Sequence, residues 1–281
     1  MTSPLERDKT CLIGSVTFGL GSVNDWRASS TVCVLGVFSA LCYRMLMSRP
    51  GTEAPTLHHE MRLWQAGMRF VAGIDEAGRG ALAGPVAAAA VIVPPHAEFT
   101  GVWVQVRDSK LLSPAVRTEL AAAIRAAALS WGVGMASAEE IDAMGIGPAT
   151  RLAMLRAVEA LRPGPDYLLI DWVKLPQINI RQESHAKADR TIVSVAAASI
   201  LAKVSRDEAL IRLDRTYPDY GFASHKGYGA AAHLAALERC GPCPEHRHSF
   251  APIARRPSLF DDALRPGERP IGSRRPAEGA R

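Results

Sequence analysis

Arg69-Phe-Val-Ala-Gly-Ile-Asp-Glu-Ala-Gly-Arg-Gly80, followed directly by Ala81-Leu-Ala-Gly-Pro-Val-Ala-Ala-Ala-Ala-Val-Ile-Val93, carries the strongest structural signal in this chain. Each half contains a run of small and β-branched apolar residues, which predicts one strand over 69–75 and a second over 85–93. The glycine-rich segment between them predicts a turn, so we expect the two strands to pair.

The patterns downstream of this pair predict alternating helices and strands. Tyr167–Asp171 is apolar almost throughout, as in a strand that is buried on both faces. A Ser137/Glu140 capping box predicts a short helix. The remaining predicted elements are strands over 131–137 and 178–181 and helices over 113–130, 148–161, 190–214 and 229–238. This order indicates an α/β protein with a mixed sheet flanked by helices.

Composition bounds the class of protein. The chain has 281 residues, of which 48% are hydrophobic and 22% charged, so it is globular rather than wholly disordered. Its five cysteines are too few for a disulfide-stapled scaffold and suit a reducing compartment, so we expect a cytoplasmic protein. We also expect it to be monomeric. The longest apolar run, 31–43, is shorter than the roughly 20 residues of a membrane-spanning helix, so no stable span is expected.

Charge and patterning divide the chain into three parts. Residues 1–55 have no clear pattern and are interpreted as a poorly ordered leader or a misassigned start, with a membrane-associated segment or a signal peptide as alternatives. Residues 56–256 carry the patterned domain, and 257–281 form a disordered basic tail. Of the net charge of +5, the segment 255–281 contributes +3, so the domain itself lacks a strong basic footprint.

Four acidic residues lie where predicted elements begin or end. Asp75 and Glu76 end the first strand, Asp171 ends the strand 167–171, and Asp189 directly precedes the long helix. Such positions can converge on one point, where the carboxylates would repel one another unless they bound a hard divalent cation. Two such cations could clamp the attacking and leaving oxygens of a phosphoryl displacement.

Simpler interpretations of the same four residues stay open. Asp189 is a good helix N-cap, and Asp171 could be a turn residue. Because neighbours on a strand point to opposite faces, Asp75 and Glu76 share a site only if the strand bulges or frays, or if Glu76 contributes its carbonyl.

Four further motifs could carry chemistry. The glycines around Arg79 match no dinucleotide or phosphate-loop fingerprint, so they indicate either a close approach to a ligand or a tight hairpin. Asp108-Ser-Lys110 and His225-Lys-Gly-Tyr-Gly229 suit phosphate contact and stacking, although a lysine there could simply be solvated. Cys240 and Cys243 with His246 and His248 could bind zinc, but the spacing is unfamiliar and a buried or solvated role is favoured.

Taken together, residues 56–254 resemble the ribonuclease HII family, that is, type 2 ribonuclease H. The matching segments occur in the order of the family, and it is this ordered series that is specific. They are Val71-Ala-Gly-Ile-Asp-Glu-Ala-Gly-Arg-Gly80, Leu82-Ala-Gly-Pro-Val86, Asp108-Ser-Lys110, Leu112-Ser113 with Arg117, Leu169-Ile-Asp171, Lys187-Ala-Asp189, Ala198-Ser-Ile-Leu-Ala-Lys203, Arg206-Asp207, His225-Lys-Gly-Tyr-Gly229, His246-Arg247 and Ser249-Phe250.

The resemblance implies a ribonuclease H-like fold with a helical C-terminal extension. It also implies an endonuclease that cuts the RNA of RNA/DNA hybrids and cuts beside ribonucleotides embedded in duplex DNA, through two divalent ions, Mn²⁺ or Mg²⁺. A ribonuclease HIII-like nuclease or a catalytically silent hybrid-binding protein are the alternatives.

The resemblance also assigns roles to individual residues. The family's four metal-site acids fall on Asp75, Glu76, Asp171 and Asp189, and its tyrosine that reads the RNA–DNA junction falls on Tyr228. Its Gly-Arg-Gly element falls on Gly78, Arg79 and Gly80, while Lys110 and Lys187 are expected to hold phosphates. Two positions depart from the common pattern, because Trp172 and Ala188 stand where glycine is frequent.

Overall fold

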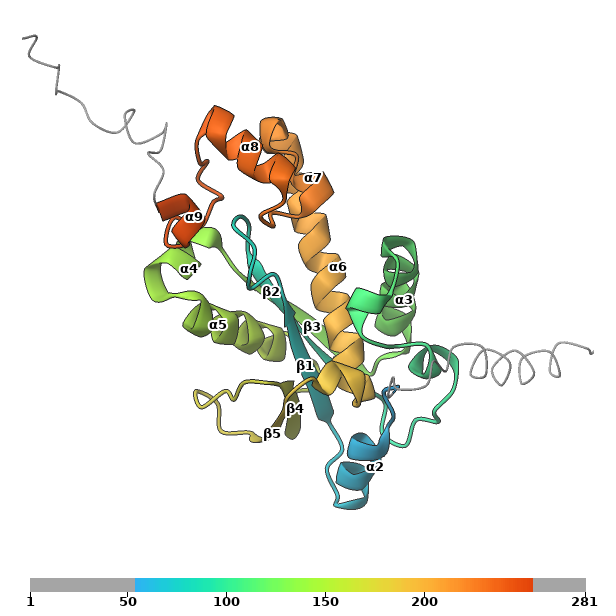
Figure 1. Cartoon of the computed structure of the whole chain (residues 1–281). Coiled ribbons are helices and arrows are strands. Elements are labelled where there is room, and N and C mark those ends of the chain that lie inside the picture. Colours follow the sequence, from blue (N-terminus) through green and yellow to red (C-terminus); the bar gives the residue numbers. More distant parts are fainter. Residues whose placement is uncertain (1–53, 255–281) are drawn as a thin grey trace, which may run out of the picture. The chain divides into compact units, whose positions relative to one another are not determined.

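One five-stranded mixed sheet forms the centre of the protein (Figure 1). The structure, a computed structural model, describes residues 54–254, so the predictions for most of the leader and for the tail lie outside the described residues. The strands are β1 (Val71–Ala77), β2 (Val86–Ile92), β3 (Ser130–Ala136), β4 (Tyr167–Asp171) and β5 (Arg181–His185), in the spatial order β3-β2-β1-β4-β5. β2 is antiparallel to β1 and β3, whereas β4 is parallel to β1 and β5.

Helices cover both faces of this sheet, as the sequence predicts (Figure 1). They are α2 (His58–Gln65), α3 (Pro114–Ala127), α4 (Ala138–Met144), α5 (Ile146–Glu159), α6 (Val193–Thr216), α7 (Phe222–His225), α8 (Ala231–Cys240) and α9 (Ala251–Ala254). Short 3-10 helices are η1 (Gly101–Val104), η2 (Ser109–Leu111), η3 (Ala188–Arg190) and η4 (Pro218–Tyr220).

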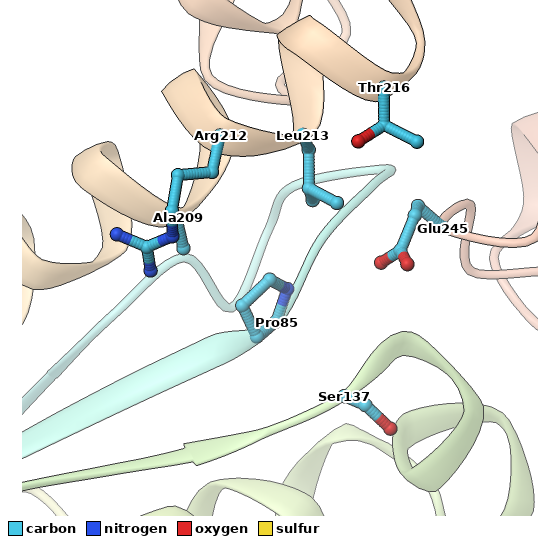
Figure 2. A pocket seen from close by; sticks show the side chains of 7 residues that line it. All are labelled: Pro85, Ser137, Ala209, Arg212, Leu213, Thr216 and Glu245. Atoms are coloured by element: carbon cyan, nitrogen blue, oxygen red, sulfur yellow. The ribbon is translucent and has the colours of Figure 1, made fainter.

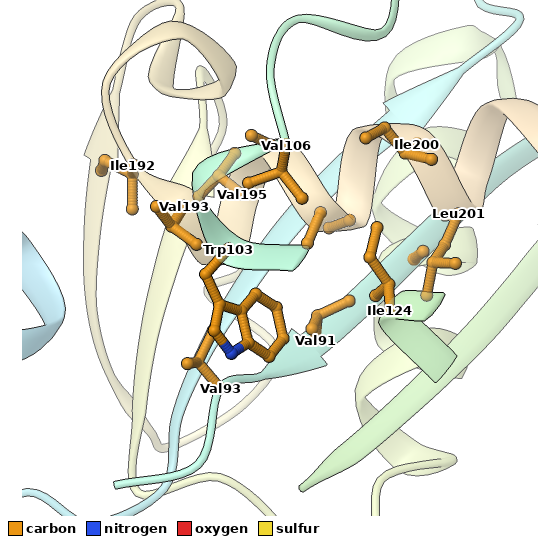
Figure 3. Packing of buried hydrophobic residues seen from close by; sticks show 14 of the residues in the cluster. Val91, Val93, Trp103, Val106, Ile124, Ile192, Val193, Val195, Ile200 and Leu201 are labelled. Atoms are coloured by element: carbon orange, nitrogen blue, oxygen red, sulfur yellow. The ribbon is translucent and has the colours of Figure 1, made fainter. Parts of the chain in front are cut away.

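The alternation of side chains along the strands separates two hydrophobic cores. Val71 of β1 faces the core formed with α2, α3 and α6, whereas Ala72 and Ile74 face the core formed with α4 and α5. Figure 3 shows the first core, where Trp103 and Ile124 pack beside the apolar side of α6. Because β1 and β2 are buried on both faces, they read as continuous apolar runs rather than alternating ones.

Helix α6 lies unusually close to β1. A Cβ atom at Gly73 would sit 2.2 Å from the backbone carbon of Ser194, so only glycine permits this approach. The close packing places the buried first turns of α6 directly beneath the strand that carries Asp75 and Glu76.

The helical C-terminal extension packs over the segment between β1 and β2. The Leu82 N–H donates to the Gly227 carbonyl at 2.8 Å, and the Arg247 N–H donates to the Leu82 carbonyl at 2.8 Å. Phe222, Leu237 and Ile253 form a third, smaller core there with Leu82. The extension therefore fixes the conformation of the glycine-rich segment.

Some local predictions differ from the structure. The fifth strand begins at Arg181 rather than covering 178–181, because it is a polar edge strand with no apolar run to mark it. Helix α2 was not predicted. Asp189 does not cap α6: it lies within η3, and the N-cap of α6 is Ile192 without a side-chain hydrogen bond. Among residues 54–254, no helix is both long and apolar enough to cross a membrane.

Candidate active site

The carboxyl ends of two parallel strands bring the predicted acids together. The register pairs Ile74 of β1 with Ile170 of β4, so the next residues, Asp75 and Asp171, lie side by side where this parallel pairing ends. The charge of Asp171 acts on Asp75, on Glu76 and on Asp189. The structure thus gathers all four predicted acids around Asp171.

Asp75 is one of two buried acids in this group, with Asp189. Its side chain is buried, and its Oδ1 accepts the N–H of Glu76 at 2.7 Å. Burial first, and then the charges of Glu76 and Asp171, raise the pKa of Asp75 well above its usual value, while a hydrogen bond from Ser199 of α6 opposes the rise.

Glu76 leaves β1 on the other face. The register places Asp75 opposite Ala89 and Glu76 opposite Ala88, which belong to different cores. The Glu76 carboxylate nevertheless lies near Asp171. Burial, and then the charge of Asp171, raise the pKa of Glu76, while the nearby Arg79 opposes the rise. Its Oε1 lies 3.4 Å from Arg79 Nη1, and its Oε2 is buried without a hydrogen-bond partner.

The turn after β5 fixes the remaining two acids. The Ala188 N–H donates to Asp171 Oδ1 at 2.8 Å, which ties η3 to the end of β4. Asp189 is the next residue and is buried; burial, then the charges of Asp108 and Asp171, raise its pKa. Ala188 packs in the core with ordinary backbone angles, so this position does not need the family's frequent glycine.

A fifth acid, Asp108, belongs to the same neighbourhood, although the sequence pattern gave it no part in the acidic cluster. It is buried, caps η2 through the Lys110 N–H at 3.0 Å, and lies 3.5 Å from Arg190 Nε. Lys110 Nζ stands between Asp108 Oδ1 at 4.0 Å and Asp189 Oδ2 at 3.7 Å. Burial by itself would lower the pKa of Lys110. The surrounding carboxylates raise it by more, so this lysine stays charged.

The acidic cluster fits divalent cations. Its donors are carboxylate oxygens, which Mg²⁺ and Mn²⁺ prefer, and burial disfavours their negative charge unless a cation compensates it. The unpartnered Glu76 Oε2 is a free acceptor in a buried position, which costs free energy as long as no cation or donor reaches it.

The predicted Gly-Arg-Gly element is held rigidly at one end and open at the other. Gly78 has φ +92°, and a Cβ there would lie 1.8 Å from Arg206 Nε, so this residue must be glycine. Gly80 is exposed, and a Cβ there would meet no atom within 4 Å, so its backbone is accessible. Between them, the Arg79 guanidinium carbon lies 4.4 Å from the ring centre of Trp172.

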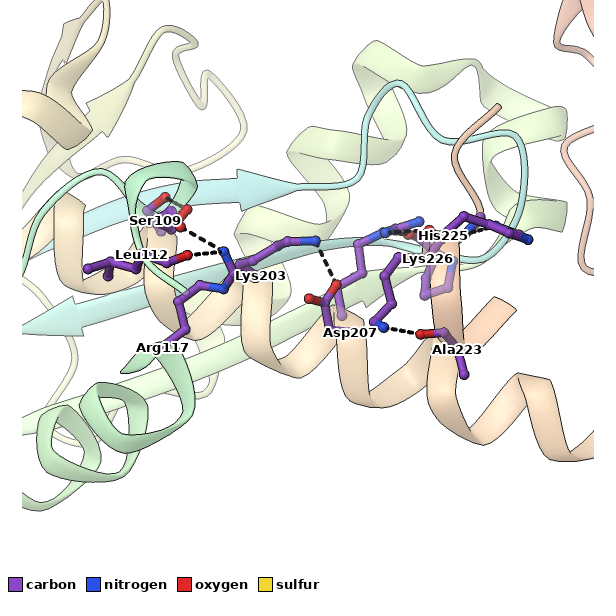
Figure 4. Close-up of polar contacts among 12 residues, drawn as sticks. Ser109, Leu112, Arg117, Lys203, Asp207, Ala223, His225 and Lys226 are labelled. Atoms are coloured by element: carbon purple, nitrogen blue, oxygen red, sulfur yellow. Dashed lines mark hydrogen bonds and ion pairs between the residues drawn. The ribbon is translucent and has the colours of Figure 1, made fainter. Parts of the chain in front are cut away.

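Tyr228 lies beside α6, and Lys187 directly precedes η3. Tyr228 is partly exposed, with the guanidinium of Arg206 at 5.2 Å and Nζ of Lys203 at 5.8 Å from its ring centre. Lys203 Nζ forms an ion pair with Asp207 Oδ1 at 2.7 Å. Figure 4 draws this contact. Lys187 is exposed in a left-handed conformation immediately before η3.

The candidate zinc ligands do not assemble. His246 Nδ1 lies 3.2 Å from Cys243 Sγ, but within the described residues neither Cys240 nor His248 joins them at metal-ligand distance. The favoured interpretation of this motif, a buried or solvated role, therefore agrees with the structure.

Two features outside the acidic cluster were not predicted. His59, Glu183 and His185 place ligand-type atoms within 4.8 Å of one another, but Glu183 is already bonded to Arg62 at 2.7 Å and to the Tyr167 hydroxyl at 2.8 Å. Because 59 and 183 lie on separate elements, no local pattern could reveal this group. A hollow of about 300 Å³ lies between Pro85, Glu245 and the end of α6 (Figure 2), and none of the acidic cluster lines it.

Comparison with known proteins establishes the family. Residues 72–253 match the family model described as Ribonuclease HII. The chain belongs to the ribonuclease HII family. A ribonuclease HII from Dehalococcoides mccartyi (strain ATCC BAA-2266 / KCTC 15142 / 195) is 48% identical over 213 residues, which cover 75% of this chain and 99% of the relative. One from Geobacillus kaustophilus is 50% identical over 197 residues, 70% of this chain and 74% of the relative.

Solved structures agree with the fold. The ribonuclease H2 from Pyrococcus horikoshii OT3 has a TM-score of 0.55 at 24% identity, covering 66% of this chain and 95% of that chain. The RNase HII in a PCNA complex from Archaeoglobus fulgidus has a TM-score of 0.55 at 29% identity, covering 68% and 99%. The predicted ribonuclease H-like fold and the prediction of a metal-dependent ribonuclease H are confirmed, and ribonuclease HII enzymes act on RNA/DNA hybrids.

Proposed function

We propose that this ribonuclease HII hydrolyses the RNA strand of RNA/DNA hybrids and also cuts on the 5′ side of single ribonucleotides embedded in duplex DNA, leaving 5′-phosphate and 3′-hydroxyl ends. One observation carries the proposal: Asp75, Glu76 and Asp189 all lie within electrostatic range of Asp171, in a buried setting where an acceptor oxygen of Glu76 has no partner. This arrangement suits phosphodiester hydrolysis assisted by divalent cations.

The four acids would hold two divalent ions, Mn²⁺ or Mg²⁺. When bound, such a pair supplies an activated water and stabilises the leaving 3′ oxygen of an in-line displacement. The protein's own contribution is to fix the carboxylates in advance. The Glu76 N–H restrains Asp75, and the Ala188 N–H restrains Asp171, so both carboxylates are oriented by the backbone rather than by flexible side chains.

Selection of RNA would come from the glycine-rich segment and from Tyr228. The 2′-hydroxyl is the group that distinguishes RNA from DNA. The accessible backbone at Gly80, next to the rigid Gly78, can donate to it or accept from it. Tyr228 would stack on the following sugar and favour a deoxyribose there. Arg79, Lys110 and Lys187 would bind phosphates.

The test is cleavage of a labelled DNA duplex that contains one ribonucleotide, with an all-DNA duplex as control and with or without EDTA. We expect cleavage of the first duplex only, and only when Mg²⁺ or Mn²⁺ is present. Asp75→Asn and Asp171→Asn should abolish cleavage while folding is nearly intact, whereas Glu139→Gln, an exposed acid on α4, should cleave like the wild type. Full Mg²⁺-dependent activity in either asparagine variant would refute the assignment.

Two outcomes separate the alternatives. A protein that binds the hybrid without cutting it would be a hybrid-binding protein rather than a nuclease. A protein that cuts long hybrids but not the single ribonucleotide would resemble ribonuclease HIII in specificity. Tyr228→Ala should lose the preference for the single ribonucleotide. Tyr228→Phe should keep it, because the aromatic ring does the stacking. Equal selectivity in the two variants would argue against the stacking role.

A further inference from the structure

Trp172, the residue that directly follows Asp171, has a strained backbone. Its φ is +63°, and the Val173 N–H closes a tight turn onto the Asp171 carbonyl at 2.8 Å. A γ-turn with a positive φ at its central residue is rare and strained, and a bulky side chain makes it more so. Strain of this kind concentrates at functional sites, because folding alone gives no reason to retain it.

Neither packing nor backbone pairing accounts for a tryptophan at this position. The side chain is 59% exposed, so it contributes little to either core. The Trp172 N–H does donate to the His185 carbonyl at 3.1 Å, but any residue other than proline could make that bond.

The ring does have one well-defined contact. The Arg79 guanidinium carbon lies 4.4 Å from its centre, while the Arg79 carbonyl accepts from buried Arg247 at 2.8 Å. The guanidinium thus lies over the face of the ring, and its Nη1 also lies 3.4 Å from Glu76 Oε1, so its remaining N–H groups are the ones that a phosphate would meet. Arg79 is thereby held at both its backbone and its side chain, beside Glu76.

We propose that Trp172 is a substrate-binding residue, which forms with Arg79 a stacked clamp for the sugar-phosphate backbone of the nucleic acid. The Arg79 N–H groups bind a phosphate, and the exposed part of the Trp172 ring lies against the adjoining sugar. This assignment rests on the proposed function, because it requires a nucleic-acid substrate at the acidic cluster. It explains why the chain keeps an exposed aromatic residue in a strained turn next to Asp171.

A set of substitutions at position 172 separates the ring from the turn. Trp172→Ala and Trp172→Gly both remove the ring, but only glycine relieves the left-handed backbone. We expect both to raise KM for the single-ribonucleotide duplex by about tenfold with kcat within about twofold of the wild type. Trp172→Phe should recover most of the loss. The glycine variant should unfold at a higher temperature than the alanine variant, although both bind equally weakly.

Direct binding gives a second readout. The fluorescence anisotropy of a labelled RNA/DNA hybrid, measured in EDTA, should show the same weakening of binding. Hybrid binding should also quench the tryptophan fluorescence of the wild-type protein, and Trp172→Phe should lack the part of this quenching that comes from Trp172. Trp131→Phe, on β3 beneath Arg125, is the matched control and should behave like the wild type. In a double-mutant cycle, Arg79→Lys should weaken binding, and Trp172→Ala should add little to that loss.

The outcomes are distinguishable from those of the proposed function. If the wild type neither binds nor cuts hybrids, the proposed function fails. If the wild type is active and Trp172→Ala and Trp172→Gly match it in KM and affinity, the clamp fails alone. Recovery by glycine but not by phenylalanine would show that only the turn matters and would also overturn the clamp. If the alanine variant does not fold, the glycine and phenylalanine variants decide.

Discussion

Asp75 occupies a position that is unfavourable for a negative charge. It is buried, and the charges of Glu76 and Asp171 add to the effect of burial in raising its pKa. A group whose pKa is raised on folding contributes stability below its ordinary pKa of 3.8 and loses that contribution as the pH rises through the folded value. Without cations, the folded enzyme should therefore become less stable as the carboxylate ionises.

This predicts a specific response to metal. Mn²⁺ at about 100 times its Kd should raise the unfolding temperature of the wild type by about 5 to 10 °C. Asp75→Asn should unfold at a higher temperature than the wild type in EDTA at pH 8, because repulsion is removed, and should gain less from Mn²⁺. Thermal unfolding followed by circular dichroism measures both. An equal gain from Mn²⁺ in the two proteins would show that Asp75 does not bind the ion.

At the scale of elements, two buried guanidinium groups hold the segment between β1 and β2. Arg206 donates to the carbonyls of Pro85 at 2.9 Å and Ala83 at 3.1 Å, and Arg247 donates to that of Gly84 at 3.0 Å. Burial lowers the pKa of both residues, that of Arg247 to about 9. The positive charges of the two guanidinium groups are thus compensated by several carbonyl dipoles rather than by a carboxylate. These hydrogen bonds fix the loop between β1 and β2.

The two glycines of this loop should respond differently to alanine. Gly78→Ala should cost about 3 kcal/mol or more, because its Cβ would collide with Arg206 and its φ is positive. Gly80→Ala should change the free energy of unfolding by less than about 0.5 kcal/mol, since nothing surrounds that Cβ. Its effect should instead appear as a reduced preference for RNA over DNA. Urea unfolding and paired cleavage assays check this, and equal destabilisation by both would contradict it.

The C-terminal helices contain a chain of hydrogen bonds whose proton positions can be deduced. The Cys243 N–H donates to His246 Nδ1 at 2.9 Å, so a neutral His246 carries its proton on Nε2. That proton faces His233 Nε2 at 3.0 Å, and His233 Nδ1–H then donates to the Tyr228 carbonyl at 2.9 Å. The loop of Tyr228 is therefore held by two neutral histidines.

Acid should break this chain. Burial, and then the neighbouring His233, lower the pKa of His246 from 6.5 to about 4. The unfolded chain takes up the proton first, so the free energy of unfolding should fall between pH 6.5 and 4, by at most about 3 kcal/mol from this group. His246→Asn keeps an acceptor for the Cys243 N–H without titrating, and should flatten the dependence. Urea unfolding across this range measures it, and an unchanged slope in the variant would contradict the explanation.

At the scale of the whole molecule, the described residues build three hydrophobic cores. The buried residues of all three hydrophobic clusters fall between Leu57 and Ile253. We propose that residues 56–256 form the folding and catalytic unit. The segment 255–281, with its net charge of +3, would add only salt-sensitive attraction to phosphates.

A protein of residues 56–256 should accordingly unfold within about 2 °C of the full chain, which is a difference of less than about 1 kcal/mol. It should cleave the single-ribonucleotide duplex with a similar kcat and a weaker dependence of kcat/KM on salt. Calorimetry and cleavage at several salt concentrations provide the comparison. A much lower unfolding temperature would mean that the flanking residues contribute to the fold.

Local patterns in the amino-acid sequence were enough to predict the class of fold and the pairing of the first two strands, because apolar periodicity and short motifs are local properties. They also marked the four acids at the ends of elements, whose role as metal ligands stays a prediction. They were also enough to indicate the family, since an ordered series of motifs is specific even where each is weak. Three facts emerged only from the packed molecule: Asp108 joins the acidic cluster, Asp189 is not the cap of α6, and Arg206 and Arg247 hold the glycine-rich segment. These facts depend on contacts between residues far apart in the chain, and such contacts, with the burial and electrostatics that follow from them, exist only once the elements have packed.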